Sequence, residues 1–190
     1  RAQTPFPEET MNTRIAIAPE ADYATIAAPG AVRIQRLLPG PIERVWEYLA
    51  DGELRRQWLA AGDIAPQAGA SFELVWRNDE LTDPPGRKPE GFGEEHRMQS
   101  RILEFDPPHR LAFTWNDTGK VAFDLEPVGD KVMLTIHHEG ISDRGNMLMV
   151  GAGWHMHANV LEARLGGRET EPFWDGWLRL RGEYERRIPA

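Results

Sequence analysis

The histidines are the side chains of this sequence best suited to acid–base or metal chemistry, because the chain has six of them and no cysteine. His155 and His157 lie two residues apart in an expected helix, so they point about 200° apart and cannot share a metal ion. His137 and Glu139 share one face of an expected strand, and His138 lies on the other. Two ligands from one strand do not complete a site, so we expect structural or surface roles and no bound metal.

Strand parity predicts that other polar side chains face the interior. His96 and Ser100 share a parity with apolar Met98, and His138 shares one with the apolar residues of its own strand. His155, at the edge of the apolar stripe of the expected long helix, would join them. A few polar groups within an apolar lining are typical of a small-molecule pocket.

The same groups allow two other interpretations. Each histidine could be hydrogen-bonded at the rim of the fold and do nothing else. Alternatively, His96 or His138 could act as the general base of a cyclase- or hydratase-type enzyme. No serine lies in a nucleophile elbow and no glycine-rich loop could cradle a phosphate, so we assign no catalytic residue and no cofactor.

Tryptophan is frequent, with seven in 190 residues. Trp46 and Trp154 are expected to fill the core. Trp58, Trp76 and Trp115 fall near the ends of expected elements, where aromatic rings more readily line the mouth of a cavity. The alternative is that these three rings also fill the core.

The element that must position these residues is a long helix over Met147–Leu165. Its main apolar stripe, which we expect to face a sheet, contains Met147, Val150, Gly151, Trp154, Ala158, Leu161 and Leu165. A second, weaker stripe on the opposite side contains Met149, Ala152, Met156, Val160 and Ala163. A helix that is apolar on two sides must be covered on two sides.

The rest of the chain can supply both covers. A first strand at 32–38 is followed by a short helix from Pro41 and a second one over Glu53–Leu59. Five alternating segments then predict antiparallel strands, interrupted by a long loop over Asn78–Phe92. After the long helix, Phe173–Ile188 has the pattern of another amphipathic helix. We expect it to dock on Met149, Met156 and Val160, either within the chain or across a homodimer.

Composition and charge limit the class of protein. The net charge of −8 comes without a basic stripe, so binding to nucleic acid or to an anionic membrane is not expected. The absence of cysteine and of any long apolar run favours a soluble, cytoplasmic protein. We expect an N-terminal arm over 1–30, whose first ten residues precede the first methionine and carry no structural weight. One domain over 31–168 and the C-terminal helix within 169–190 complete the chain.

Four segments carry a resemblance to a known family. The segments PIERVWEYLADGELRRQWLAAGDI at 41–64, RILEFDPPHRLAFTW at 101–115, FDLEPVGDKVMLTIHHEG at 123–140 and the pair Gly153-Trp154 resemble, in order, motifs of the activator-of-heat-shock-protein-90-ATPase homologue family. The resemblance implies the α+β helix-grip fold of the SRPBCC superfamily, in which a curved antiparallel sheet wraps a long C-terminal helix and two short helices follow strand one. The family name implies a chaperone-regulatory interaction module as an alternative function, with a chaperone as partner.

Our main expectation is a domain that binds a small apolar molecule between sheet and helix. Small residues at Gly151 and Ala158 would leave room for a cavity of a few hundred Å³. The expected ligand-binding residues are Trp58, Phe72, Leu74, Trp76, His96, Met98, Ser100, Phe113, Trp115, Phe123, Leu134, His138, Gly151, Trp154, His155 and Ala158.

Overall fold

The computed structural model describes residues 20–190, in which one curved antiparallel sheet wraps a long helix. The elements are η1 (Glu20–Asp22), β1 (Thr25–Ala28), β2 (Ala31–Pro39), α1 (Ile42–Ala50), α2 (Gly52–Arg55), β3 (Ser71–Trp76), η2 (Asn78–Glu80), β4 (His96–Asp106), β5 (Arg110–Trp115), β6 (Gly119–Val128), β7 (Lys131–Glu139), α3 (Arg144–Gly166) and α4 (Phe173–Arg187). This α+β arrangement confirms the predicted helix-grip fold.

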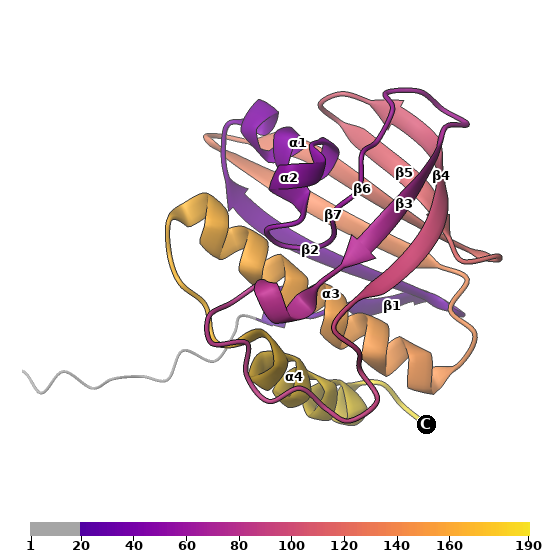
Figure 1. Cartoon of the computed structure of the whole chain (residues 1–190), viewed down its shortest axis with the longest axis vertical. Helices are drawn as coiled ribbons and strands as arrows, with labels where there is room; N and C mark the ends of the chain where they lie inside the picture. The colour runs from indigo at the N-terminus through magenta and orange to yellow at the C-terminus, as the bar shows by residue number, and fades with distance from the viewer. Residues whose placement is uncertain (1–19) are drawn as a thin grey trace, which may run out of the picture.

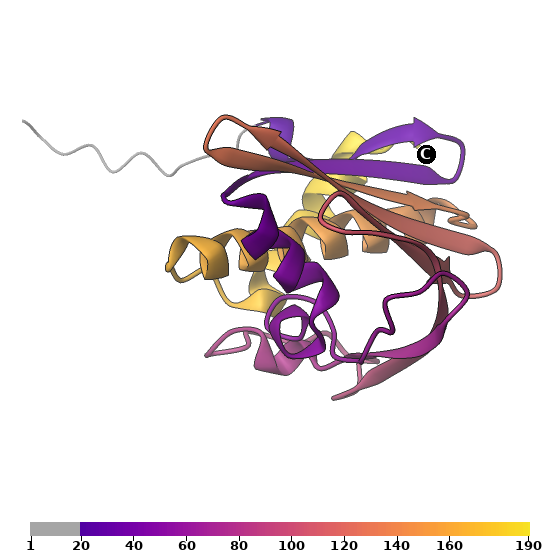
Figure 2. The same ribbon diagram turned by 90° about the horizontal axis from the view of Figure 1, so that it is seen from above.

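The sheet has the strand order β1-β2-β7-β6-β5-β4-β3. Strands β3 to β7 form the predicted meander of five, and β2 returns beside β7, where Ile34 pairs with Ile136. Figures 1 and 2 show α3 lying along the concave side of this sheet, with α4 on the side of α3 away from the strands. The layers are therefore, in order, the sheet, α3 and α4. Within residues 20–190, no helix is long and apolar enough to cross a membrane.

The ends of the helices are fixed by local chemistry. The carboxylate of Asp143 accepts a hydrogen bond from the backbone N–H of Asn146 at 2.9 Å, which caps α3. Gly167 ends α3 with a φ of 64°, a left-handed conformation that glycine adopts without strain. Helix α2 ends at Arg55, earlier than the predicted end at Leu59, and turns continue to Leu59, whose backbone N–H donates to the Arg55 carbonyl at 2.8 Å.

Helix α3 is covered on both sides, as its two apolar stripes predict, but one residue of the expected sheet-facing stripe lies on the α4 side. Gly151 faces α4, since a Cβ there would lie 3.5 Å from the ring of Tyr184. Met156 and Val160 are buried, whereas Met149 is 41% exposed and is not covered by α4. Helix α4 thus docks within its own chain, on part of the surface expected for it.

Part of the segment expected to be an N-terminal arm forms regular structure. Residues 1–19 lie outside the described residues, but Glu20–Asp22 and Thr25–Ala28 form η1 and the edge strand β1. The backbone N–H of Ala24 donates to the Tyr184 hydroxyl at 2.7 Å. All four side chains of β1 are exposed, so the strand has no apolar alternation by which the sequence could reveal it.

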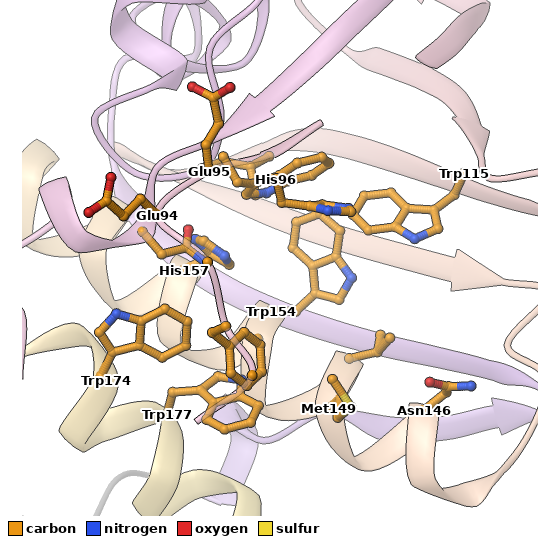
Figure 3. Close-up of a pocket in the computed structure, with 18 residues that line it drawn as sticks. Glu94, Glu95, His96, Trp115, Asn146, Met149, Trp154, His157, Trp174 and Trp177 are labelled. Carbon is orange, nitrogen blue, oxygen red and sulfur yellow. The ribbon is translucent and has the colours of Figure 1, made fainter. Parts of the chain in front are cut away.

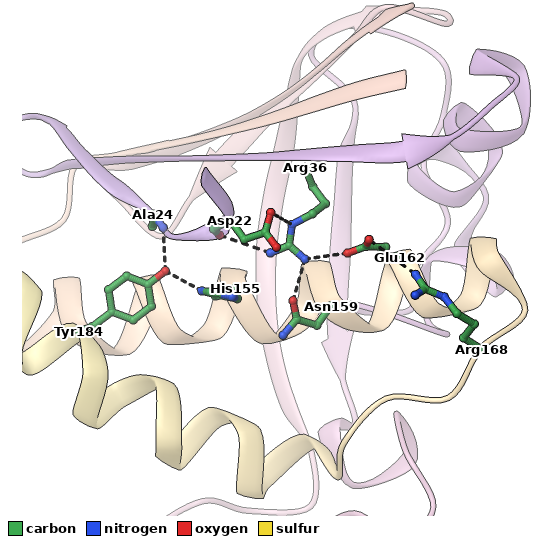
Figure 4. A network of polar contacts seen from close by, with 8 residues as sticks. All are labelled: Asp22, Ala24, Arg36, His155, Asn159, Glu162, Arg168 and Tyr184. Carbon is green, nitrogen blue, oxygen red and sulfur yellow. Dashed lines mark hydrogen bonds and ion pairs between the residues drawn. The ribbon is translucent and has the colours of Figure 1, made fainter. Parts of the chain in front are cut away.

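A buried arginine ties this segment to the helices (Figure 4). Arg36, on β2, donates to Asn159 Oδ1 at 2.6 Å and to Glu162 Oε2 at 3.1 Å on α3. It also donates to the backbone oxygen of Asp22 at 3.3 Å. One guanidinium therefore links η1, β2 and α3 at the point where the N-terminal segment crosses the sheet.

Candidate functional site

A cavity of about 420 Å³ opens between α3, α4, the 91–95 loop and the ends of three strands (Figure 3). Its lining consists of Leu59, Trp76, Asn78, Gly91, Phe92, Gly93, Glu94, Glu95, His96, Trp115, Asn146, Met149, Val150, Gly153, Trp154, His157, Trp174 and Trp177. The volume falls within the range of about 300–1,000 Å³ that is usual for small-molecule sites.

One wall of the cavity is built by the sheet and α3. Trp76 ends β3 and pairs in register with His96, the first residue of β4. Trp115 ends β5, and its ring lies 5.4 Å from that of Trp76 and 5.7 Å from that of Trp154 on α3. Three strand ends thus place their aromatic side chains together, Trp76 and Trp115 among them.

The opposite wall comes from α4 and the long loop. Trp174 and Trp177 are one helical turn apart, and both pack against Phe92, with ring centroids at 5.0 and 5.3 Å. The indole N–H of Trp174 donates to Asp79 Oδ1 at 2.8 Å, which fixes the orientation of that ring. Neither tryptophan was among the residues predicted for the site, although their spacing on one helix face was a usable signal.

Gly153, and not Gly151, is the small residue of α3 that opens the cavity. A Cβ at Gly153 would meet no heavy atom within 4 Å, because this face of the helix borders empty space. Ala158 is 1% exposed and does not line the cavity. Neither of the two small residues expected to make room for a ligand lines this cavity, because Gly151 faces Tyr184 and Ala158 is packed in the core.

His157 is the buried titratable group of the lining. Its Nδ1 lies 2.7 Å from the carbonyl oxygen of Trp58, which can only accept, so Nδ1 carries the proton and Nε2 keeps its lone pair. Burial lowers the pKa of His157 to about 4, so the ring is neutral at pH 7. From the sequence, His157 was considered only as a possible metal ligand and was not predicted to lie in the site.

His138 is hydrogen-bonded within the protein core. The indole N–H of Trp154 donates to His138 Nδ1 at 3.0 Å, which occupies the lone pair that a general base would need. Burial lowers the pKa of His138 to about 4. His138, expected as a ligand contact or general base, does not line the cavity.

The other expected polar contacts are divided between the cavity and the core. His155 lies on the α4 side of α3, 2.9 Å from the Tyr184 hydroxyl (Figure 4), and burial lowers its pKa to about 3. The hydroxyl of Ser100 donates to the Thr114 carbonyl at 2.6 Å. Of the four polar residues expected, only His96 lines the cavity. Within residues 20–190, no three potential metal ligands come together to hold an ion.

The remaining expected wall residues belong to the packed core and do not line this cavity: Trp58, Phe72, Leu74, Met98, Phe113, Phe123 and Leu134. Phe113 lies at the centre of their ring contacts, 5.8 Å from Phe72 and 5.6 Å from Phe123. Large interlocking rings fill the middle of the sheet's concave face. The cavity lies at one end of this face, where the strands stop and the 91–95 loop passes over them.

Two carboxylates lie at the mouth. Glu95 forms ion pairs with Arg77 and Arg97, and the hydrogen bond from Arg97 lowers the pKa of this carboxyl. Glu94 borders the opening beside it. The lining contains no lysine or arginine, so the cavity offers no positive charge to an anionic ligand.

Residues 39–166 match the family described as activator of Hsp90 ATPase homolog 1-like protein. The chain belongs to this family. A solution structure of the protein encoded by gene BPP1335 of Bordetella parapertussis is 34% identical to it. That match covers 90% of this chain and 95% of the other, with a TM-score of 0.72. Among curated proteins, none matches this chain.

Two other solved structures show the same fold at lower identity. CalU16 from Micromonospora echinospora is 19% identical, covering 84% of this chain and 89% of its own, with a TM-score of 0.62. DynU16, from the dynemicin biosynthetic locus, is 20% identical, covering 72% of this chain and 47% of its own, with a TM-score of 0.58. At these identities the likeness concerns the fold.

The cavity extends beyond the part of the chain that matches the Hsp90 ATPase activator homologue family. The match ends at Gly166, the last residue of α3. Trp174 and Trp177 lie on α4, after that boundary. One aromatic wall of the cavity is thus contributed by a segment outside the family match.

Proposed function

We propose that this protein binds a small, largely apolar molecule in the cavity between α3, α4 and the 91–95 loop. The observation that carries the proposal is the lining itself, in which five tryptophans from the sheet, α3 and α4 surround about 420 Å³ of space. Large aromatic surfaces around a cavity favour burial of apolar ligand surface. With no cysteine in the chain, we place this activity in a reducing compartment such as the cytoplasm.

A binding role accounts for the histidines better than a catalytic one. His138 is occupied by Trp154, and His155 is directed toward Tyr184. His157 and His96 line the cavity. Among the described residues, no carboxylate is hydrogen-bonded to either ring, so neither histidine is part of a proton relay. The chaperone-regulatory alternative rests on the family description alone.

The test is uptake of Prodan, a neutral naphthalene fluorophore without hydrogen-bond donors. The wild-type chain should raise its emission saturably, and Gly153→Leu should lower the affinity at least about tenfold by filling the cavity. The matched control is Gly182→Leu on α4, where a Cβ also meets no atom within 4 Å but the residue does not line the cavity. Both leucines favour helix, so neither variant should lose stability. Absence of uptake by the wild type would overturn the proposal.

A further inference from the structure

His157 presents an unused hydrogen-bond acceptor to the cavity. Its protonated Nδ1 is bound to the Trp58 carbonyl, so the ring cannot turn over without breaking that 2.7 Å bond. Nε2 has no partner among residues 20–190, and the residue belongs to the cavity lining. The acceptor is therefore held in place by the fold and left open on the ligand side.

A second polar atom of the lining is also without a partner. Among the described residues, the buried side-chain nitrogen and oxygen atoms that lack a hydrogen bond are Arg36 Nε and Asn78 Oδ1. Arg36 belongs to the N-terminal network, whereas Asn78 lines the cavity. By contrast, the indole N–H groups of Trp154 and Trp174 are already bound to His138 and Asp79.

We propose that the ligand is an aromatic molecule carrying a hydroxyl or N–H group, of the phenol or arylamine type, which donates a hydrogen bond to Nε2 of His157. The aromatic part packs among the tryptophans, and the donor satisfies the acceptor that the ligand would otherwise cover. A ligand that covers this acceptor without donating to it removes the acceptor's hydrogen bond to water and provides none in return. Sites built in this way discriminate strongly against analogues that lack the donor.

This inference rests on the proposed function, and the experiment separates the two. We would measure displacement of Prodan by 2-naphthol and by 2-methoxynaphthalene, which differ in whether the oxygen can donate. In the wild type, 2-naphthol should bind at least about tenfold more tightly. Equal affinities would overturn the inference and leave the proposed function intact. Failure of Prodan and both competitors to bind would overturn both.

The decisive variant is His157→Asn. The Asn amide can replace the Nδ1–H donor to the Trp58 carbonyl but has no atom at the position of Nε2, so the preference for 2-naphthol should fall to about threefold or less. The matched control, His137→Asn, changes a histidine on the outer face of β7, 38% exposed, and should keep the full preference. A preference that survives in His157→Asn would refute the role of His157.

A measurement on the unaltered chain covers the case in which the variant does not fold. The ¹⁵N resonance of His157 Nε2 should be that of an unprotonated nitrogen and should shift when 2-naphthol is added. The same resonance should stay in place when 2-methoxynaphthalene is added. A protonated Nε2 in the free protein, or identical responses to the two compounds, would overturn the inference.

Discussion

Arg55 shows how a single buried charge can organise a turn. Its guanidinium donates to the carbonyl oxygens of Leu49 at 3.0 Å and Ala60 at 3.1 Å, and also to that of Gly62. Burial lowers its pKa to about 10, so the group remains charged at neutral pH. Without this side chain, carbonyl groups at the end of α1 and after α2 would be buried without donors. Nothing in the local sequence distinguishes Arg55 from its exposed neighbour Arg56.

At this scale, Arg55→Met should lower the free energy of unfolding by more than about 3 kcal/mol, because several buried acceptors lose a charged donor. Arg56→Met is the control, since Arg56 is exposed and should change stability by less than about 0.5 kcal/mol. Urea titration of the two variants measures both values. A loss below about 1 kcal/mol for Arg55→Met would mean that water satisfies these carbonyls.

At the scale of elements, the sequence predicts the order of strands and helices well, because alternation and caps are local signals. The flanks of α3 are harder to predict. Trp154 faces the sheet as expected and donates to His138, whereas Gly151, on the flank of the same stripe, faces Tyr184 of α4. A periodic pattern gives the direction of an apolar stripe but not which element covers each flank. The sequence therefore did not predict that Gly153 borders the cavity.

Helix α4 is both a cover for α3 and a wall of the cavity, so its docking can be tested through stability and binding together. Leu180 is fully buried and lies one turn from both Gly176 and Tyr184, the α4 residues that approach Met156 and Gly151. Leu180→Asp should cost at least about 3 kcal/mol and abolish Prodan uptake, because a carboxylate cannot be buried there unpaired.

The matched control on the same helix is Leu178→Asp. Leu178 is 38% exposed, so its replacement should leave the melting temperature and the Prodan affinity almost unchanged. Thermal melts and titrations of both variants distinguish the two positions. If Leu180→Asp binds Prodan as the wild type does, α4 is not needed to form the cavity.

At the scale of the whole molecule, the buried histidines are joined to partners that are distant in sequence. His138 is bonded to Trp154, His155 to Tyr184, and His157 to the Trp58 carbonyl, 99 residues away. Strand parity and helix phase can predict that a histidine points inward, but not which distant group it meets. The tertiary contacts decide whether each ring serves the fold or the cavity, and so the site was only partly predictable.

These three histidines also predict how the stability of the whole chain depends on pH. Burial lowers their pKa values to about 4, 3 and 4 for His138, His155 and His157, against about 6.5 in an unfolded chain. Above pH 7 the rings are neutral in both states, so stability is complete there. As the pH falls from about 6.5 toward 4, only the unfolded chain takes up protons, and stability is lost.

Each histidine contributes a slope of about 1.4 kcal/mol per pH unit within that window, so the three together give about 4 kcal/mol per unit. Chemical denaturation at a series of pH values measures the slope. His157→Asn removes one of the three groups, and its slope between pH 5 and 6 should be shallower than that of the wild type by about 1.4 kcal/mol per unit. Because carboxylates titrate alike in both proteins, the difference between the two slopes isolates the histidine. Equal slopes would show that His157 is already accessible to protons in the folded chain, and its Nε2 would then be unavailable as an acceptor in mildly acidic solution.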